Sequence, residues 1–397
     1  MAAHPSRSTT ETPPRVFALI GVVLLLAGMA ALAADRLPSR LTDVEFWGFV
    51  QNASELGGTF ESENWISNEI GLPSVMARLN EMLGTGGVYI GVGPEQNLTL
   101  IASLRPRLAF VVDIRHQNTV QHLLYKALFE LSATRSQFLS RLFSRAHIPT
   151  VTERSTVVEL FNAYRSAPAD RQVFDDTLGR VTVLLRQKHG FTMSAQDLTT
   201  LGRLLAVFRD FGPAITYGTR AADSPPPDSA VPPMPSYAEL MALADGQGVR
   251  RSYLASEQQY RVVRNLQQRN LIVPLTGDFA GPKTLRTIGR FLKDRNATVS
   301  AFYVSNVENY LFRLAGRSVD GGLKTFYENV ATLPIDRSSL FIRSGNGTGP
   351  LPAGGMPYST LASIQGTLAS VRDGRVLTPA DIFNAGNVAE AGPSKGR

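Results

Sequence analysis

Two glycines and an aspartate have the types and the spacing of a nucleotide-binding turn. In the stretch "VYIGVGPEQN", Gly91 and Gly93 follow an apolar β-type run, and Asp113 lies 20 residues after Gly93. In doubly wound sheets such glycines let the backbone approach a ligand, and an acidic residue about 20 positions later binds ribose hydroxyls. The same glycines also fit a tight strand-to-helix turn without a ligand, and Asp113 also fits a helix cap or a pair with Arg115. The sequence leaves both interpretations open.

The glycine pattern departs from both standard forms of the motif. The G-x-G-x-x-G form fails at its last position, which is Gln96. The E/D-x-G-x-G-x-G form of class I S-adenosylmethionine methyltransferases fails at both ends, because Tyr89 replaces the acid and Glu95 replaces the last glycine.

Three further polar residues are candidates for proton transfer or substrate contact: Glu69, Asp278 and Asn306. Asp278 follows the strand-like run "LIVPLTG", Asn306 follows "SAFYVS", and Glu69 ends the polar stretch "SENWISNE". Polar residues at strand ends line the crevice of an open α/β sheet, although Asp and Asn also cap helices. A carboxyl group acts as acid or base only where the fold brings it to the substrate.

Composition excludes several kinds of chemistry. The chain has no cysteine, which removes thiolate catalysis, disulfides and Cys-ligated metals. Its five histidines lack a ligand spacing, so we expect no metal site. The net charge of +7 comes from scattered residues, which predicts no nucleic-acid partner. The sequence contains no G-x-S-x-G elbow, Walker A motif or paired-carboxylate signature.

The N-terminal region predicts export or membrane attachment. Residues 16–34 are uncharged and largely apolar, and Arg7 and Arg15 precede them. Ala31-Leu32-Ala33 fits a signal-peptide cleavage site, and the run is also close to the ~20 apolar residues that span a bilayer. In both cases the positive flank predicts that the body of the protein lies outside the cytoplasm.

The remaining chain alternates between helix and strand patterns. Apolar runs predict strands over 88–92, 108–114, 271–278, 298–306 and 338–344, and helical periods predict helices that include 69–83, 118–131 and 359–371. This alternation indicates a parallel α/β sheet within one domain, residues 35–385. Residues 133–215 have helical periods only and predict a helical insertion. We expect a proline-rich loop over 222–236 and a flexible tail over 386–397.

Several longer stretches resemble an uncharacterised family of bacterial proteins. They include "GGVYIGVGPEQNLTLI", "FVVDIRHQN", "GDFAGPKTLRTIG" and "FYVSNVENYLF", and the resemblance covers about residues 45–372. That family is regarded as having a class I methyltransferase-like fold and is often described as exported and of unknown function. The resemblance implies a Rossmann-like doubly wound sheet with S-adenosylmethionine as cofactor. It matches Gly91 and Gly93 to the donor turn and Asp113 to the ribose-binding acid, with Glu95 beside them.

Three functions follow from these observations. The first is a methyltransferase of a small molecule, with Glu69, Asp278 and Asn306 near the cleft. The second is an exported, non-catalytic protein that keeps the fold and binds another small molecule. The third is an extracytoplasmic hydrolase, which lacks a nucleophile signature. Because S-adenosylmethionine is made in the cytoplasm, an external body favours the binding protein. If the apolar segment is misread, the protein is cytoplasmic and the enzyme is favoured.

Overall fold

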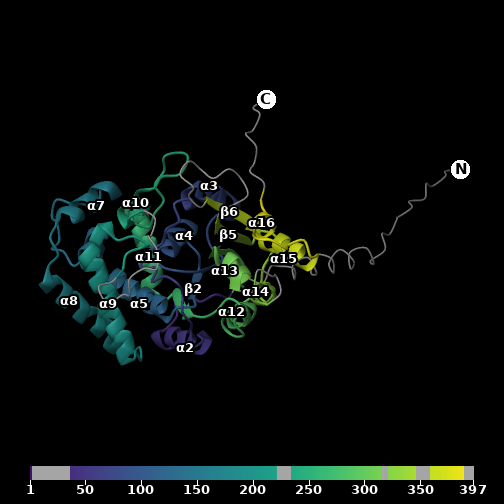
Figure 1. Cartoon of the computed structure of the whole chain (residues 1–397), viewed down its shortest axis with the longest axis horizontal. Coiled ribbons are helices and arrows are strands. Elements are labelled where there is room, and N and C mark those ends of the chain that lie inside the picture. The colour runs from purple at the N-terminus through teal and green to yellow at the C-terminus, as the bar shows by residue number, and fades with distance from the viewer. Residues whose placement is uncertain (2–35, 221–233, 315, 317–320, 346–357, 389–397) are drawn as a thin grey trace. The chain divides into compact units, whose positions relative to one another are not determined.

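A six-stranded sheet forms the centre of the structure, a computed structural model that describes residues 1, 36–220, 234–314, 316, 321–345 and 358–388 (Figure 1). Its strand order is β3-β2-β1-β4-β5-β6. The strands are β1 (Val88–Gly91), β2 (Leu108–Asp113), β3 (Ile272–Thr276), β4 (Val299–Ser305), β5 (Leu340–Gly345) and β6 (Tyr358–Ser363). The first five pair in parallel, and β6 pairs antiparallel with β5. The expected α/β fold with a mostly parallel sheet is confirmed.

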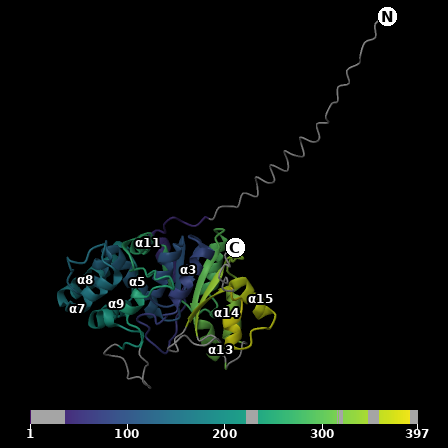
Figure 2. The same cartoon turned by 90° about the horizontal axis from the view of Figure 1, so that it is seen from above.

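The strands are buried along nearly their whole length, which explains their continuous apolar sequences. Every residue of β1, β2, β3 and β5 is buried. Sheets of this kind have helices on both faces. Figure 2 shows α3, α5 and α11 on one side of the sheet and α13 and α14 on the other. The strand order reverses between β1 and β4, and in doubly wound sheets this switch point is where ligands bind.

Ten helices among the described residues surround the sheet and its edges. They are α2 (Asp43–Ala53), α3 (Leu72–Leu83), α4 (Gln96–Leu104), α5 (His116–Leu131), α11 (Glu257–Gln268), α12 (Thr284–Lys293), α13 (Val307–Leu314), α14 (Gly322–Val330), α15 (Ile364–Arg372) and α16 (Pro379–Asn384). Helix α5 packs on β2 and β3, and α11 packs on α4 and α5.

A group of helices stands between α5 and β3 in the sequence. It comprises α6 (Arg135–Leu142), α7 (Val157–Ser166), α8 (Arg171–Val183), a π-helical turn (Leu184–Lys188), α9 (Ala195–Phe211), a 3₁₀ turn (Gly212–Ala214) and α10 (Tyr237–Ala242). Capping boxes begin α7, α9 and α10. Helix α9 packs on both α5 and α8, so this group rests on the helix that follows β2.

The start of the predicted helix 359–371 is wrong. Residues 358–363 form β6, and α15 begins only at Ile364, where the Ser363 side chain accepts a hydrogen bond from the Gly366 N–H. Pairing with β5, from Leu340 opposite Ser363 to Gly345 opposite Tyr358, stabilises the strand. A backbone ladder between distant segments thus outweighs the local helical period.

Several predictions concern residues outside the described ranges. They include the signal or anchor over 16–34, most of the proline-rich loop and most of the tail. Within the ranges that are described, no helix is long and apolar enough to cross a membrane.

Candidate functional site

The turn after β1 lies at the switch point, and the chain's own Asn97 fills it. The Asn97 amide nitrogen donates to the backbone carbonyls of Val92 at 2.8 Å, Gly93 at 2.9 Å and Pro94 at 2.8 Å. Its side-chain oxygen accepts from the Tyr89 hydroxyl at 2.8 Å. Asn97 is fully buried in the first turn of α4, so the helix that follows the turn supplies the group that holds it.

Gly91 and Gly93 are glycines for different reasons. A Cβ atom at Gly91 would lie 2.0 Å from the Asn97 side-chain oxygen and 2.5 Å from the Tyr89 hydroxyl oxygen. At Gly93 a Cβ would meet no atom within 4 Å, but the backbone has φ +79°, a conformation that favours glycine. The space beside Gly91 therefore holds side chains of this protein.

Glu95 joins the turn to the segment that precedes α3. Its buried carboxyl group accepts a hydrogen bond from the Ser67 backbone N–H, at 3.2 and 3.1 Å from the two oxygens. Burial, with a smaller contribution from the nearby Glu69 carboxylate, raises the pKa of Glu95 to about 8. At neutral pH Glu95 is therefore mostly uncharged and adds little negative charge to the turn.

Asp113 ends β2 and pairs with Arg115. This pair is one of the structural roles that the sequence left open beside ribose binding. One Asp113 carboxylate oxygen accepts from the Arg115 backbone N–H at 2.8 Å and from Nε at 3.0 Å, and the other accepts from Nη2 at 2.8 Å. Both residues are buried. A carboxylate has about four acceptor positions, so three of them are taken.

Buried polar atoms without partners lie on the neighbouring face of α5. His122 Nε2 is 3.0 Å from the Gly93 carbonyl oxygen, and burial lowers the pKa of His122 to about 4. The ring is therefore neutral, and the carbonyl acceptor places its proton on Nε2. Among the described residues, nothing hydrogen-bonds to His122 Nδ1 or to either amide atom of Asn118, one turn earlier. Such atoms are where a polar ligand or water binds.

The expected acid Glu69 and the expected Asn306 both neighbour Ser305, on the other side of the switch point. Ser305 at the end of β4 donates to one Glu69 carboxylate oxygen, and Ser344 on β5 donates to the other. Glu69 is buried, and this burial raises its pKa. Ser305 has φ +50°, an uncommon value for a non-glycine residue. Asn306 is exposed, with its side-chain oxygen 3.4 Å from the Ser305 hydroxyl.

The structure keeps Asp278 apart from this cluster. Asp278 follows β3, where its side chain accepts from the Ala280 N–H at 2.8 Å and its own N–H donates to Glu55 at 3.1 Å. Strand β3 is three positions from β4, roughly 14 Å at the usual strand spacing. Asp278 thus shapes the turn before α12.

Sequence reasoning missed Asn97 and Ser344. Asn97 lies within the quoted stretch "GPEQN", and its place at the start of a helix after a glycine turn was the available signal. Ser344 gave no signal, because its contact with Glu69 joins positions 275 residues apart. In the described part of the chain, no group of three or more His, Asp or Glu side chains is placed to hold a metal ion.

Comparison with known families places the chain. A family model described as a domain of unknown function, DUF7790, matches residues 64–192 and 229–363. The chain belongs to this family. The matched ranges make up about two thirds of the chain and contain Glu69, Gly91, Asp113 and Asn306, so the site lies within the family's part of the protein. None of the curated proteins matches the chain.

Proposed function

We propose that this chain is an exported, non-catalytic binding protein that keeps a methyltransferase-like sheet and does not bind S-adenosylmethionine at the Gly91 turn. The observation that carries the proposal is the position of Asn97. Its amide occupies the three carbonyls of the turn and the space beside Gly91.

The groups of the methyl donor do not fit the residues present. Its ammonium group needs hydrogen-bond acceptors, but each carbonyl oxygen of the turn already accepts from Asn97 and that of Gly93 also accepts from His122, so few acceptor positions remain. Its ribose hydroxyls need a carboxylate, but Asp113 is held by Arg115 in a buried pair. Three of the roughly four acceptor positions of this carboxylate are filled, so Asp113 has room for at most one ribose hydroxyl. The residues present therefore offer little to support methyl transfer at this turn.

Two sets of polar groups favour a different small polar ligand at the same edge of the sheet. On one side are the exposed Asn306 and the partly buried Ser305. On α5, beside the Gly91 turn, are the amide atoms of Asn118 and Nδ1 of His122, which have no hydrogen-bond partner among the described residues. These groups supply both donors and acceptors and no exposed charge, which suits an uncharged molecule rich in hydroxyl or amide groups. The apolar residues 16–34 support a body outside the cytoplasm, away from the methyl donor.

A small-molecule methyltransferase is the second candidate, and Glu69 favours it. A buried carboxyl group with a raised pKa at a switch point has the environment of a general base. Its contact with Ser305, whose backbone is in the left-handed region, is the kind of local strain that occurs at functional sites.

Thermal unfolding with and without ligand distinguishes the two candidates. A bound ligand stabilises the folded state by RT ln(1 + [L]/Kd), so about 1 mM S-adenosylhomocysteine would raise the Tm of a protein that binds it at micromolar Kd. We expect no change in Tm for the full-length chain. A rise that is lost in Glu69→Gln or Asp113→Ala would favour the methyltransferase.

A further inference from the structure

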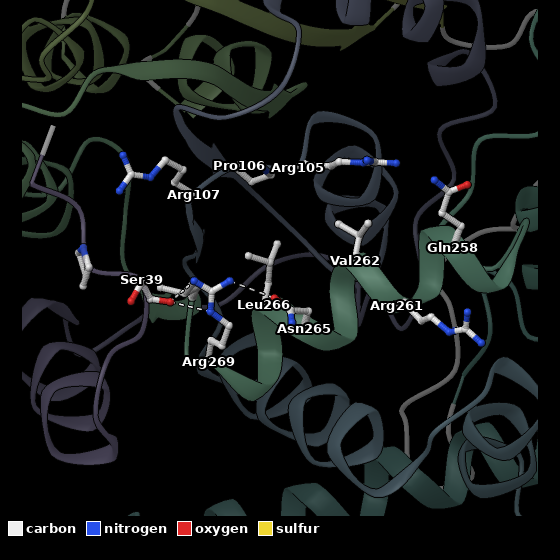
Figure 3. A pocket seen from close by; sticks show the side chains of 12 residues that line it. Ser39, Arg105, Pro106, Arg107, Gln258, Arg261, Val262, Asn265, Leu266 and Arg269 are labelled. Atoms are coloured by element: carbon white, nitrogen blue, oxygen red, sulfur yellow. Dashed lines mark hydrogen bonds between the residues drawn. The ribbon is translucent and has the colours of Figure 1, made fainter. Parts of the chain in front are cut away.

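A pocket rich in arginine lies at the edge of the sheet opposite to the Gly91 turn. It has a volume of about 550 Å³. One wall is α11, another is the turn of Arg105, Pro106 and Arg107 directly before β2, and Ser39 closes one end (Figure 3). The pocket is thus separate from the candidate site.

The lining of the pocket is positive and contains no acidic residue. Four of the twelve lining residues are arginines: Arg105, Arg107, Arg261 and Arg269. Arg269 donates to neutral acceptors, the Ser39 carbonyl at 2.6 Å and the Asn265 side-chain oxygen at 3.0 Å. Guanidinium groups bind phosphate oxygens in a bidentate manner, so this lining selects an anion and favours a phosphate.

The charges of two arginines are open to a ligand. Arg105 is exposed. Arg261 pairs with Glu153 at 2.6 Å, but both side chains are more than half exposed, at 58% and 53%. Exposed pairs of this kind are weak and screened by solvent, so an anion in the pocket can compete with Glu153.

Apolar side chains lie between the arginines. Val262 and Leu266 on α11, together with Pro106 and Leu271, line the pocket beside the guanidinium groups. Figure 3 shows Val262 and Leu266 between the Arg105 and Arg269 side chains. A surface that combines phosphate-binding groups with apolar contacts suits an amphipathic headgroup region better than free phosphate.

A segment predicted to enter a membrane shortly precedes the pocket in the sequence. The apolar residues 16–34 end four residues before Pro38, which also lines the pocket. If residues 16–34 enter a bilayer, the body of the protein is tethered to a surface of phospholipid headgroups.

We propose that this pocket binds the phosphate of an anionic phospholipid and holds the exposed face of α11 against the membrane that residues 16–34 enter. Arg105 and Arg261 contact the phosphate, and Val262 contacts the glycerol region beside it.

Lipid retention by the full-length chain tests this proposal. The protein, purified in a neutral detergent, is titrated with phosphatidylglycerol or phosphatidylcholine, and bound lipid is counted by native mass spectrometry. The test variant is Arg105→Asn with Arg261→Gln, because Arg105 has φ +47° and asparagine tolerates the left-handed region. The matched control, Arg171→Gln with Arg372→Gln, removes two exposed charges elsewhere.

We expect retention of phosphatidylglycerol over phosphatidylcholine, an affinity about tenfold or more weaker in the test variant, and little change in the control. Unfolding curves that match the wild type show that the variants are folded. Equal retention of both lipids, or unchanged affinity in the folded test variant, would overturn the proposal. Displacement of the lipid by equimolar inorganic phosphate, or binding of an acidic peptide in place of the lipid, would also overturn it.

Discussion

Replacing Gly91 with alanine tests whether the protein's own side chains fill the turn. The added Cβ would lie 2.0 Å from the Asn97 side-chain oxygen, far inside contact distance, and both Asn97 and Tyr89 are fully buried. Overpacking of a well-packed interior costs about 1–3 kcal/mol, and Asn97 cannot move without losing its bonds to the turn. We therefore expect Gly91→Ala to lower the free energy of unfolding by about 2–3 kcal/mol without any ligand.

A double-mutant cycle identifies the source of this loss. Asn97→Ala alone removes the bonds from Asn97 to the Val92 and Pro94 carbonyls and the acceptor of the buried Tyr89 hydroxyl, at a cost of about 2–4 kcal/mol. In the double variant the alanine methyl at position 91 no longer contacts Asn97. The stability losses of the two single variants should therefore add up to more than the loss in the double variant. The assay is urea unfolding of the full-length chain followed by circular dichroism, with coupling of about 1 kcal/mol or more expected. A loss below about 0.5 kcal/mol in Gly91→Ala, or additive losses, would refute the reasoning.

Three other variants test the environment of the turn. Asp113→Ala leaves Arg115 buried without its partner, and urea unfolding should show a loss of about 3–5 kcal/mol; a loss below 1 kcal/mol would contradict the buried pair. His122 has a folded pKa of about 4 against the ordinary 6.5, so the wild type should lose stability as pH falls from 6.5 to 4, and His122→Gln should weaken that loss in pH-dependent unfolding. The contribution of Glu95 to the pH dependence of stability has the opposite sign, because its folded pKa of about 8 exceeds the ordinary 4.5. The wild type should therefore lose stability as pH rises from 4.5 to 8, and an unchanged slope in Glu95→Gln would contradict a buried, uncharged acid.

The parallel part of the sheet could be predicted from sequence because its strands are buried on both faces. Strand β2, "LAFVVD", is a continuous apolar run of β-formers that fits no amphipathic helix. Strand β6 could not be predicted in the same way. Its residues, "YSTLAS", mix small polar and apolar types without a two-residue period, and pairing with the antiparallel partner β5 stabilises them as a strand.

The position of the site followed from the spacing of its residues, but its contents did not. Gly91 and Asp113 lie at the ends of neighbouring strands, as their spacing predicted. The contacts of Gly91 and Asp113 depend on the directions of other side chains. The Asn97 amide on α4 points back to the glycine turn, and the Arg115 side chain contacts the aspartate. Spacing along a chain carries no information on such directions.

Calorimetric titration of the full-length chain with S-adenosylmethionine tests the central claim most directly. If Asn97 and Arg115 hold the turn and the ribose-binding acid, millimolar donor should give no binding heat in the wild type. Micromolar binding by the wild type that disappears in Asp113→Ala would contradict the claim and would make the Gly91 turn a working donor site.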